Sequence, residues 1–285
     1  MKTAALASGF ALMVLFGGCA SPTPIDIVAA EDAFAADGYG RGVKLSFLDY
    51  SAPDAILFAP GPVNAHQALA ASPDDDLTEP RAHLVWWPLY AGIAKSADLG
   101  FTTGPFARDD DRRGHYFTVW KKQADGRWKW VIDAGVGADA SGEAAPGSAV
   151  TFLQTAGAGT GSPEQALKEI AAVEETIAGR AGAGLAAAYL DFLDDDSRLH
   201  SAGPPPAKLA ADRDAVFAAR PASVQFSALG GGASEAGDLV WTYGEAAWRE
   251  GAADRRGYYV RVWQKRPAGW RLVFDEFLPP APSAE

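Results

Sequence analysis

The sequence predicts an α+β fold built as two tandem repeats, each with helices followed by an antiparallel sheet. A segment dense in aromatic and β-branched residues at 112–135 recurs at 255–277, and each copy predicts a β-hairpin around a glycine-containing turn. Residues 25–50 and 167–193 both carry apolar side chains at helical spacing, ahead of the strand segments. The same order of elements occurs twice, which indicates a duplicated domain.

Length and composition narrow the classes of function. The chain has 285 residues, enough for two domains that each bury a core. Its net charge of −11 disfavours a nucleic-acid partner, because phosphates need clustered lysine and arginine. No two of the four histidines show metal-ligand spacing, and the glycine-rich run at 38–42 follows no strand, so it is weak evidence for a phosphate loop. We therefore expect neither a metal nor a cofactor.

The first residues predict export from the cytoplasm. Residues 3–16 form an apolar stretch too short for a confident membrane span. Small residues precede Cys19, the single cysteine, which divides a signal peptide at 1–18 from a proline-rich tether at 19–24. This pattern resembles a bacterial lipoprotein signal, which implies an acylated Cys19 that holds the protein at a membrane, on the periplasmic side of the cell envelope and at the outer membrane. The alternative is ordinary secretion with cleavage after Ala20.

The rest of the chain divides into three parts. We expect repeat 1 at 25–136, a linker at 137–163 and repeat 2 at 164–280. The linker is rich in glycine, alanine and serine, but its short apolar run at 150–153 can form an edge strand.

Two local features are expected within the repeats. Glycine pairs in the middle of both first helices, ending at Gly42 and Gly184, indicate close packing or a bend. Asn64 and Asp212 stand where the N-caps of short second helices belong. Each repeat should then continue into its strands.

The strands of repeat 1 carry a recognisable pattern. Residues 98–104 follow D-L-G-x-T-x-G, and residues 114–133 follow G-x-Y-x-T-V-W-K-K-x-x-D-G-x-W-K-x-V-x-D. This form resembles the nuclear transport factor 2-like superfamily, especially its SnoaL-like bacterial branch, and repeat 2 matches it more loosely. The resemblance implies helices packed on a curved antiparallel sheet, a cone with a pocket at its open end, and a pseudo-dimer in which the two repeats pair with each other. The superfamily includes isomerases, cyclases, dehydratases and adaptors, so the fold does not name a function.

The resemblance also allows a test for enzyme chemistry. Ketosteroid isomerases of this superfamily use an Asp base, with a Tyr and a second, protonated Asp as oxyanion donors. The base position falls on Ala59 in repeat 1 and on Ser201 in repeat 2, and neither side chain can act as a carboxylate base. The other two positions fall near Ala35, Ile177, Thr118 and Arg261. None of the three catalytic groups is retained.

Other acids and bases remain as candidates for catalysis. They are Asp133, His115, Tyr116 and His200. Strand alternation predicts that Lys129 and Asp133 share one face of the last strand, opposite Trp130. Asp133 and its counterpart Asp275 are either pocket acids or structural partners of the arginine pairs at 112–113 and 255–256. The structural role is favoured, because it would occur in both copies.

A second set of residues is expected to line a ligand pocket. Its members are Tyr116, Thr118, Trp120, Tyr259, Arg261, Trp263 and Asp275. The alternative for the aromatic members is core packing, since each can bury about 150 to 250 Å². Function is expected where the two copies differ, as His115 differs from Tyr258 and Thr118 from Arg261.

Three hypotheses for function follow. The first is a secreted, membrane-anchored lipoprotein whose domains bind a small apolar ligand or a protein partner. The alternative is an acid–base enzyme of the SnoaL-like cyclase, dehydratase or isomerase type, which requires a carboxylate or imidazole deep in an enclosed pocket. The third is an assembly module whose pockets are filled by side chains.

Overall fold

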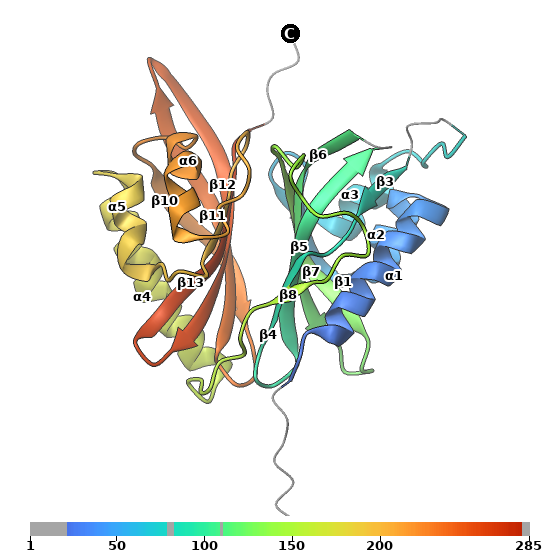
Figure 1. Ribbon diagram of the computed structural model, residues 1–285, viewed down its shortest axis with the longest axis horizontal. Coiled ribbons are helices and arrows are strands. Elements are labelled where there is room, and N and C mark those ends of the chain that lie inside the picture. The colour runs from blue at the N-terminus through green and yellow to red at the C-terminus, as the bar shows by residue number, and fades with distance from the viewer. Residues whose placement is uncertain (1–21, 79–82, 109–110, 281–285) are drawn as a thin grey trace, which may run out of the picture.

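The computed structural model describes residues 22–78, 83–108 and 111–280, so the predicted signal peptide and Cys19 lie outside the described residues. The described chain forms two sheets with helices on their outer sides, and the sheets face each other across the middle of the molecule (Figure 1). This arrangement confirms the predicted α+β class.

The first half consists of three helices and eight strands in the described residues. The helices are α1 (Ile25–Arg41), α2 (Val43–Tyr50) and α3 (Ala65–Ala71). The strands are β1 (Ser51–Phe58), β2 (Pro62–Asn64), β3 (Leu84–Trp86), β4 (Tyr90–Ile93), β5 (Leu99–Arg108), β6 (Asp111–Lys122), β7 (Trp128–Gly137) and β8 (Thr151–Phe152). Their order in the sheet is β2-β1-β7-β6-β5-β4-β8, and β3 also pairs with β5.

The second half repeats this plan. Its helices are α4 (Pro163–Ala181), α5 (Leu185–Tyr189) and α6 (Arg213–Ala218), with single 3₁₀ turns η1 (Leu190–Phe192) and η2 (Ala210–Asp212). Its strands are β9 (Arg198–His200), β10 (Gln225–Ala233), β11 (Leu239–Glu250), β12 (Ala253–Arg266) and β13 (Gly269–Leu278). The order β10-β11-β12-β13-β9 corresponds to β4-β5-β6-β7-β1, except that the long strand β10 covers the positions of both β3 and β4.

Local sequence signals explain several element boundaries. Gly42 has a φ of +92°, which a residue with a side chain rarely adopts, and the predicted bend separates α1 from α2 there. The Asn64 side chain accepts a hydrogen bond from the Gln67 backbone N–H (3.0 Å), which confirms this N-cap. Asp212 stands at the N-cap position of α6, as predicted, but its carboxylate does not cap α6 and instead accepts hydrogen bonds from backbone N–H groups of the preceding loop.

A β-bulge corrects the predicted faces of β7. Val119 pairs with Ile132 and Trp120 pairs with Trp130, so Val131 is an extra residue without a partner. The bulge reverses the alternation, and Asp133 therefore lies on the face of Trp130, opposite to the prediction. The closing strand of the second half, β13, carries the equivalent irregularity.

The two sheets pack through the faces that their helices leave free. The rings of Phe117 on β6 and Phe274 on β13 stack with centroids 4.0 Å apart and planes 10° apart. Val260 and Val262 of β12 belong to the same buried cluster as the core of the first half. One apolar cluster therefore spans both halves, and the second half has a further cluster of its own beneath α4 and α5. Within the described residues, no helix is both long and apolar enough to cross a membrane.

Candidate functional site

The helix-facing side of the first sheet holds a buried carboxyl group that sequence reasoning missed. Glu31 of α1 accepts hydrogen bonds from the indole N–H groups of Trp86 (2.6 Å) and Trp120 (2.9 Å), and from the Thr102 hydroxyl. Burial raises the pKa of Glu31 to about 7, although these hydrogen bonds oppose the rise. Trp120 is thus a donor to a buried acid and part of a filled core.

Asp133, Thr118 and Tyr116 lie in the same interior. The Thr118 hydroxyl donates to an Asp133 carboxylate oxygen at 2.7 Å. Burial raises the pKa of Asp133 well above its usual range and also raises that of Tyr116. None of these candidates lines either of the cavities described below. Tyr116 and Thr118 are buried, whereas Asp133 is half-buried.

In the second half the equivalent acid faces a cation. Glu174 of α4 occupies the place of Glu31 and accepts hydrogen bonds from the Thr242 hydroxyl (2.6 Å) and the Trp263 indole (3.1 Å). Arg261, where the first half has Thr118, also donates to Glu174. The side chain of Arg261 is 0% exposed, so its charge needs buried acids around it.

Asp275 extends this network and shows that its expected partners were wrong. It accepts a hydrogen bond from Arg261 Nε at 3.1 Å and lies 2.6 Å from Arg220 Nη1. The arginines expected to pair with it contact other acids: Arg255 contacts Glu250 at 2.8 Å, and Arg256 is 3.9 Å from Glu245. Asp275 is a structural partner of arginines, but of different ones.

The same expectation fails for Asp133 in the first half. Arg112 donates to backbone carbonyl groups of the linker, including that of Ala140 at 3.2 Å. Arg113 contacts Asp111 at 2.7 Å. Asp133 keeps only its short polar contact with Thr118 among the hydrogen bonds of the described residues.

The two candidate histidines meet between the two halves. The ring centroids of His115 on β6 and His200 on β9 are 5.2 Å apart. His115 Nε2 lies 3.2 Å from a Glu143 carboxylate oxygen, and His200 Nδ1 lies 3.7 Å from Glu276. Burial lowers the pKa of His200 well below its usual value. Both rings are nearly inaccessible, and they line neither cavity described below.

An open cleft of about 440 Å³ lies between α4 and the strands β10, β11 and β12. Its walls are mostly apolar or lack a side chain, and they include Leu167, Ile170, Ala171, Phe226, Ala228 and Gly231. Its polar groups are Glu174, Glu175, Thr242 and Tyr259. Among the predicted pocket residues, Tyr259 lines this cleft. Arg261 and Trp263 do not line it but donate hydrogen bonds to Glu174, and Asp275 accepts a hydrogen bond from Arg261.

The size of one side chain explains why the corresponding space in the first half is filled. Trp86 and Phe226 occupy the same register, opposite Phe106 on β5 and Ala246 on β11. The Trp86 ring reaches Glu31 and packs so closely on Gly38 that a Cβ there would lie 2.6 Å from it. The smaller Phe226 leaves the space beside Glu174 open.

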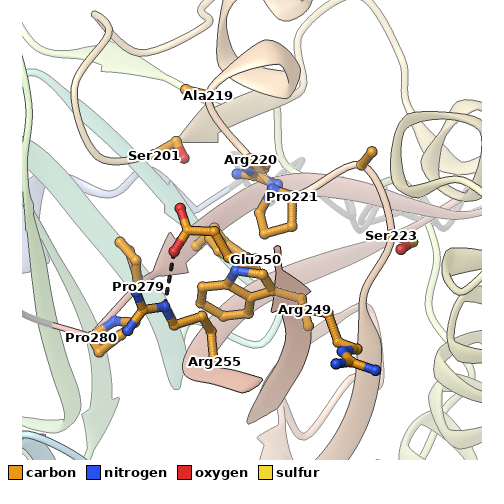
Figure 2. A pocket seen from close by; sticks show the side chains of 13 residues that line it. Ser201, Ala219, Arg220, Pro221, Ser223, Arg249, Glu250, Arg255, Pro279 and Pro280 are labelled. Carbon is orange, nitrogen blue, oxygen red and sulfur yellow. Dashed lines mark hydrogen bonds and ion pairs between the residues drawn. The ribbon is translucent and has the colours of Figure 1, made fainter. Parts of the chain in front are cut away.

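A second cavity, of about 730 Å³, lies where β11 ends and β12 begins (Figure 2). Arg220, Arg249 and Arg255 line it, together with Trp248 and Phe277. Each arginine already has an acidic partner, because Arg255 contacts Glu250, Arg249 is 3.6 Å from Asp254, and Arg220 contacts Asp275. The cavity therefore offers little uncompensated charge to an anion.

The sequence did contain a signal for Glu31 and Glu174. In both first helices an acid interrupts the apolar stripe at the same place, as Ile27-Glu31-Phe34 and Ile170-Glu174-Ile177. An acid on the core face of a helix needs buried partners, and its recurrence in both copies points to a built network. No comparable signal marks Arg220, which follows the short helix α6 and reaches Asp275 from a distant part of the chain.

Comparison with known proteins yields similar structures and no family assignment. No family model and no curated protein matches the sequence. Among solved structures, the chain is similar to a nuclear transport factor 2-like protein with a cystatin-like fold from Novosphingobium aromaticivorans (18% identity, TM-score 0.34, 42% of this chain and 86% of the other). It is also similar to a nuclear transport factor 2-like protein of unknown function from Pseudomonas putida (14% identity, TM-score 0.36, 43% of this chain and 92% of the other). A third similar structure is that of a ketosteroid isomerase-like protein from Erwinia carotovora atroseptica (14% identity, TM-score 0.35, 41% of this chain and 97% of the other). Likeness at this level does not indicate what this chain binds.

Proposed function

We propose that the second half of this protein binds a small, elongated, apolar molecule in the cleft between α4 and the sheet. The observation that carries the proposal is the cleft itself, an open space of about 440 Å³ with apolar walls and a few polar groups. Ligand sites of this size are typically apolar clefts in which a few polar groups fix the orientation of the ligand.

The polar groups favour a ligand with a neutral hydrogen-bonding end. The Glu174 carboxylate is balanced by Arg261, which contacts it directly, and Asp275 is balanced by Arg220. A ligand carboxylate would approach Glu174 with no free cation among the described lining residues. A hydroxyl group can instead donate to Glu174 or exchange hydrogen bonds with Thr242 and Tyr259. A long-chain alcohol therefore represents the expected ligand class.

The acid–base enzyme alternative has less support. The cleft carboxylate Glu174 is already engaged by Thr242, Trp263 and Arg261. A group held by three donors is poorly placed to take a proton from a substrate.

The proposal also covers the domain architecture of the protein and its location in the cell. We infer that the two halves are nuclear transport factor 2-like domains, at 25–136 and 164–280, that form a pseudo-dimer within one chain. The signal-like residues 1–18 and Cys19 support a lipid-anchored protein of the cell envelope. Mass spectrometry of the mature N-terminus tests this location. A mature chain that begins with a diacylglyceryl-modified Cys19 supports it, and one that begins with an unmodified Ser21 overturns it.

The cleft is tested by titrating the protein with 1-decanol and with decanoate, using isothermal calorimetry. Ala171→Trp fills the cleft from α4, and Ala172→Trp is its matched control, because the neighbouring alanine is also exposed but does not line the cleft. Decanol should bind the wild type and Ala172→Trp, bind Ala171→Trp at least tenfold more weakly, and bind more tightly than decanoate. Equal binding to both variants would refute the cleft as the site.

A further inference from the structure

We propose that β10 is a docking edge for an extended, uncharged peptide segment of a partner protein, which adds to the second sheet as a further strand. One side chain of that peptide would enter the cleft beside α4, and to this extent the inference rests on the proposed function. The backbone pairing stands on separate observations of the strand and its neighbours.

The outer edge of β10 is open. Its nine residues form one end of the second sheet, and within the described residues β10 pairs with β11 alone. Ser234 N–H donates to the Leu239 carbonyl at 2.9 Å, so by antiparallel alternation Gly231 and Ala233 turn their N–H and C=O groups away from β11. Residues 227–231 are exposed, whereas Ala233 is only 8% exposed. The outward donors and acceptors of β10 are therefore accessible as far as Gly231.

This edge lacks the usual protection against pairing. Exposed edge strands are normally kept single by lysine, proline, inward charges or very short length. The segment Gln225–Ala233 contains no charged residue and no proline. Its three successive glycines leave the backbone accessible, and Leu229, at the register shift, is 47% exposed. A β-bulge is thus the remaining protective device.

The first half shows what kind of segment such an edge accepts. The strand β4 is equivalent to residues 230–233 of β10, and it is covered by β8 from the linker, which pairs with it in parallel. Thr151 N–H donates to the Leu89 carbonyl at 3.0 Å, and Leu153 N–H donates to the Ala91 carbonyl at 2.8 Å. The covering segment at 150–153 is apolar, β-branched and uncharged. A partner segment of the same chemistry fits the free edge.

The chain's own covering segment is already committed to β4, which is why the occupant is assigned to a partner. The cleft continues directly from the edge, because Phe226, Ala228 and Gly231 of β10 form part of its wall. A peptide on β10 would therefore combine main-chain hydrogen bonds, which give affinity, with one side chain in a pocket, which gives specificity.

The probe is a capped, fluorescently labelled peptide with the sequence of residues 149–154. Fluorescence anisotropy measures its affinity, and amide hydrogen exchange measures protection of Gly231, the exposed residue with an outward N–H group. We expect the peptide to slow exchange at this amide at least tenfold. Leu229→Lys should weaken binding at least tenfold, because a lysine protects the edge. Leu190→Lys is the matched control at a leucine that is 63% exposed and away from β10, and it should bind like the wild type.

The outcomes separate this inference from the proposed function. Absence of β10 protection at millimolar peptide overturns the docking edge, whatever decanol does. Protection that rises with protein concentration without peptide also overturns it, because a second copy then occupies the edge. If the peptide protects β10 while decanol fails to bind, the edge stands and the small-ligand proposal fails.

Discussion

The network around Arg261 gives the sharpest prediction about stability. Replacing Arg261 with methionine keeps most of the volume but removes the cation shared by Glu174 and Asp275, of which Asp275 lies 3.1 Å from Arg261 Nε. Removing one partner of a buried ion pair typically costs about 3–5 kcal/mol, because the remaining charge is left uncompensated. The guanidinium also lies 3.9 Å from the centroid of the Tyr259 ring, which adds a cation–π contact to the loss. The free energy of unfolding should therefore fall by at least about 3 kcal/mol.

Urea denaturation followed by tryptophan fluorescence measures this change. Arg256→Met is the control, because Arg256 is 77% exposed and 3.9 Å from Glu245, and its loss should cost no more than about 0.5 kcal/mol. In a double-mutant cycle, Arg261→Met with Glu174→Gln should cost less than the sum of the single variants, since Asp275 and Arg220 stay balanced. A cost below about 1 kcal/mol for Arg261→Met, or strict additivity, would refute the reasoning.

Three further predictions concern single positions. Burial raises the pKa of Glu31 from 4.5 to about 7, so its neutral form stabilises the fold by about 3 kcal/mol below pH 4.5, and this contribution is lost as the pH rises through 7. Glu31→Gln should therefore lose less stability than the wild type between pH 5 and pH 8, measured by urea midpoints. Phe274→Ala should cost about 3–5 kcal/mol in the same assay, because its fully buried ring stacks on Phe117 between the sheets. Asn64→Ala should cost about 1 kcal/mol, the usual effect of losing an N-cap bond such as that to Gln67.

Each of these three predictions has an outcome that would contradict it. An unchanged pH profile in Glu31→Gln would mean that another group carries the dependence. A loss below about 1 kcal/mol for Phe274→Ala would contradict a shared core between the sheets. Asn64→Ser should behave like the wild type because serine also caps helices, and equal losses in Asn64→Ser and Asn64→Ala would contradict the capping explanation.

Much of the fold followed from local sequence signals. The closing hairpins were predicted because alternation and a turn glycine are properties of neighbouring residues, and Gly126 and Gly269 do adopt positive φ. The edge strand in the linker was predicted from the apolar run at 150–153, and β8 lies within it. The bend at Gly42 also depended on one residue and its backbone conformation.

The predictions failed where one residue changes a register. Val131 looks like any strand residue, yet as a bulge it inverts every later side chain of β7, so Asp133 was placed on the wrong face. The open cleft depends on a register as well, because Trp86 and Phe226 are equivalent only once their strands are paired. Glu174 could have been found from its place in an apolar helix stripe. Arg220 could not, because only tertiary packing brings it to Asp275.

The lengths of the sheet edges limit how this protein can assemble. In the described chain the strands β2, β3, β8 and β9, which each have one neighbour, have three, three, two and three residues, whereas β10 has nine. A monomer with one reactive end can pair but cannot polymerise, because fibre growth needs two complementary surfaces on each copy. The short linker strand β8 pairs with β4 and thereby removes a second long edge from the molecule. One long edge can therefore stay open without allowing copies to polymerise through their sheets.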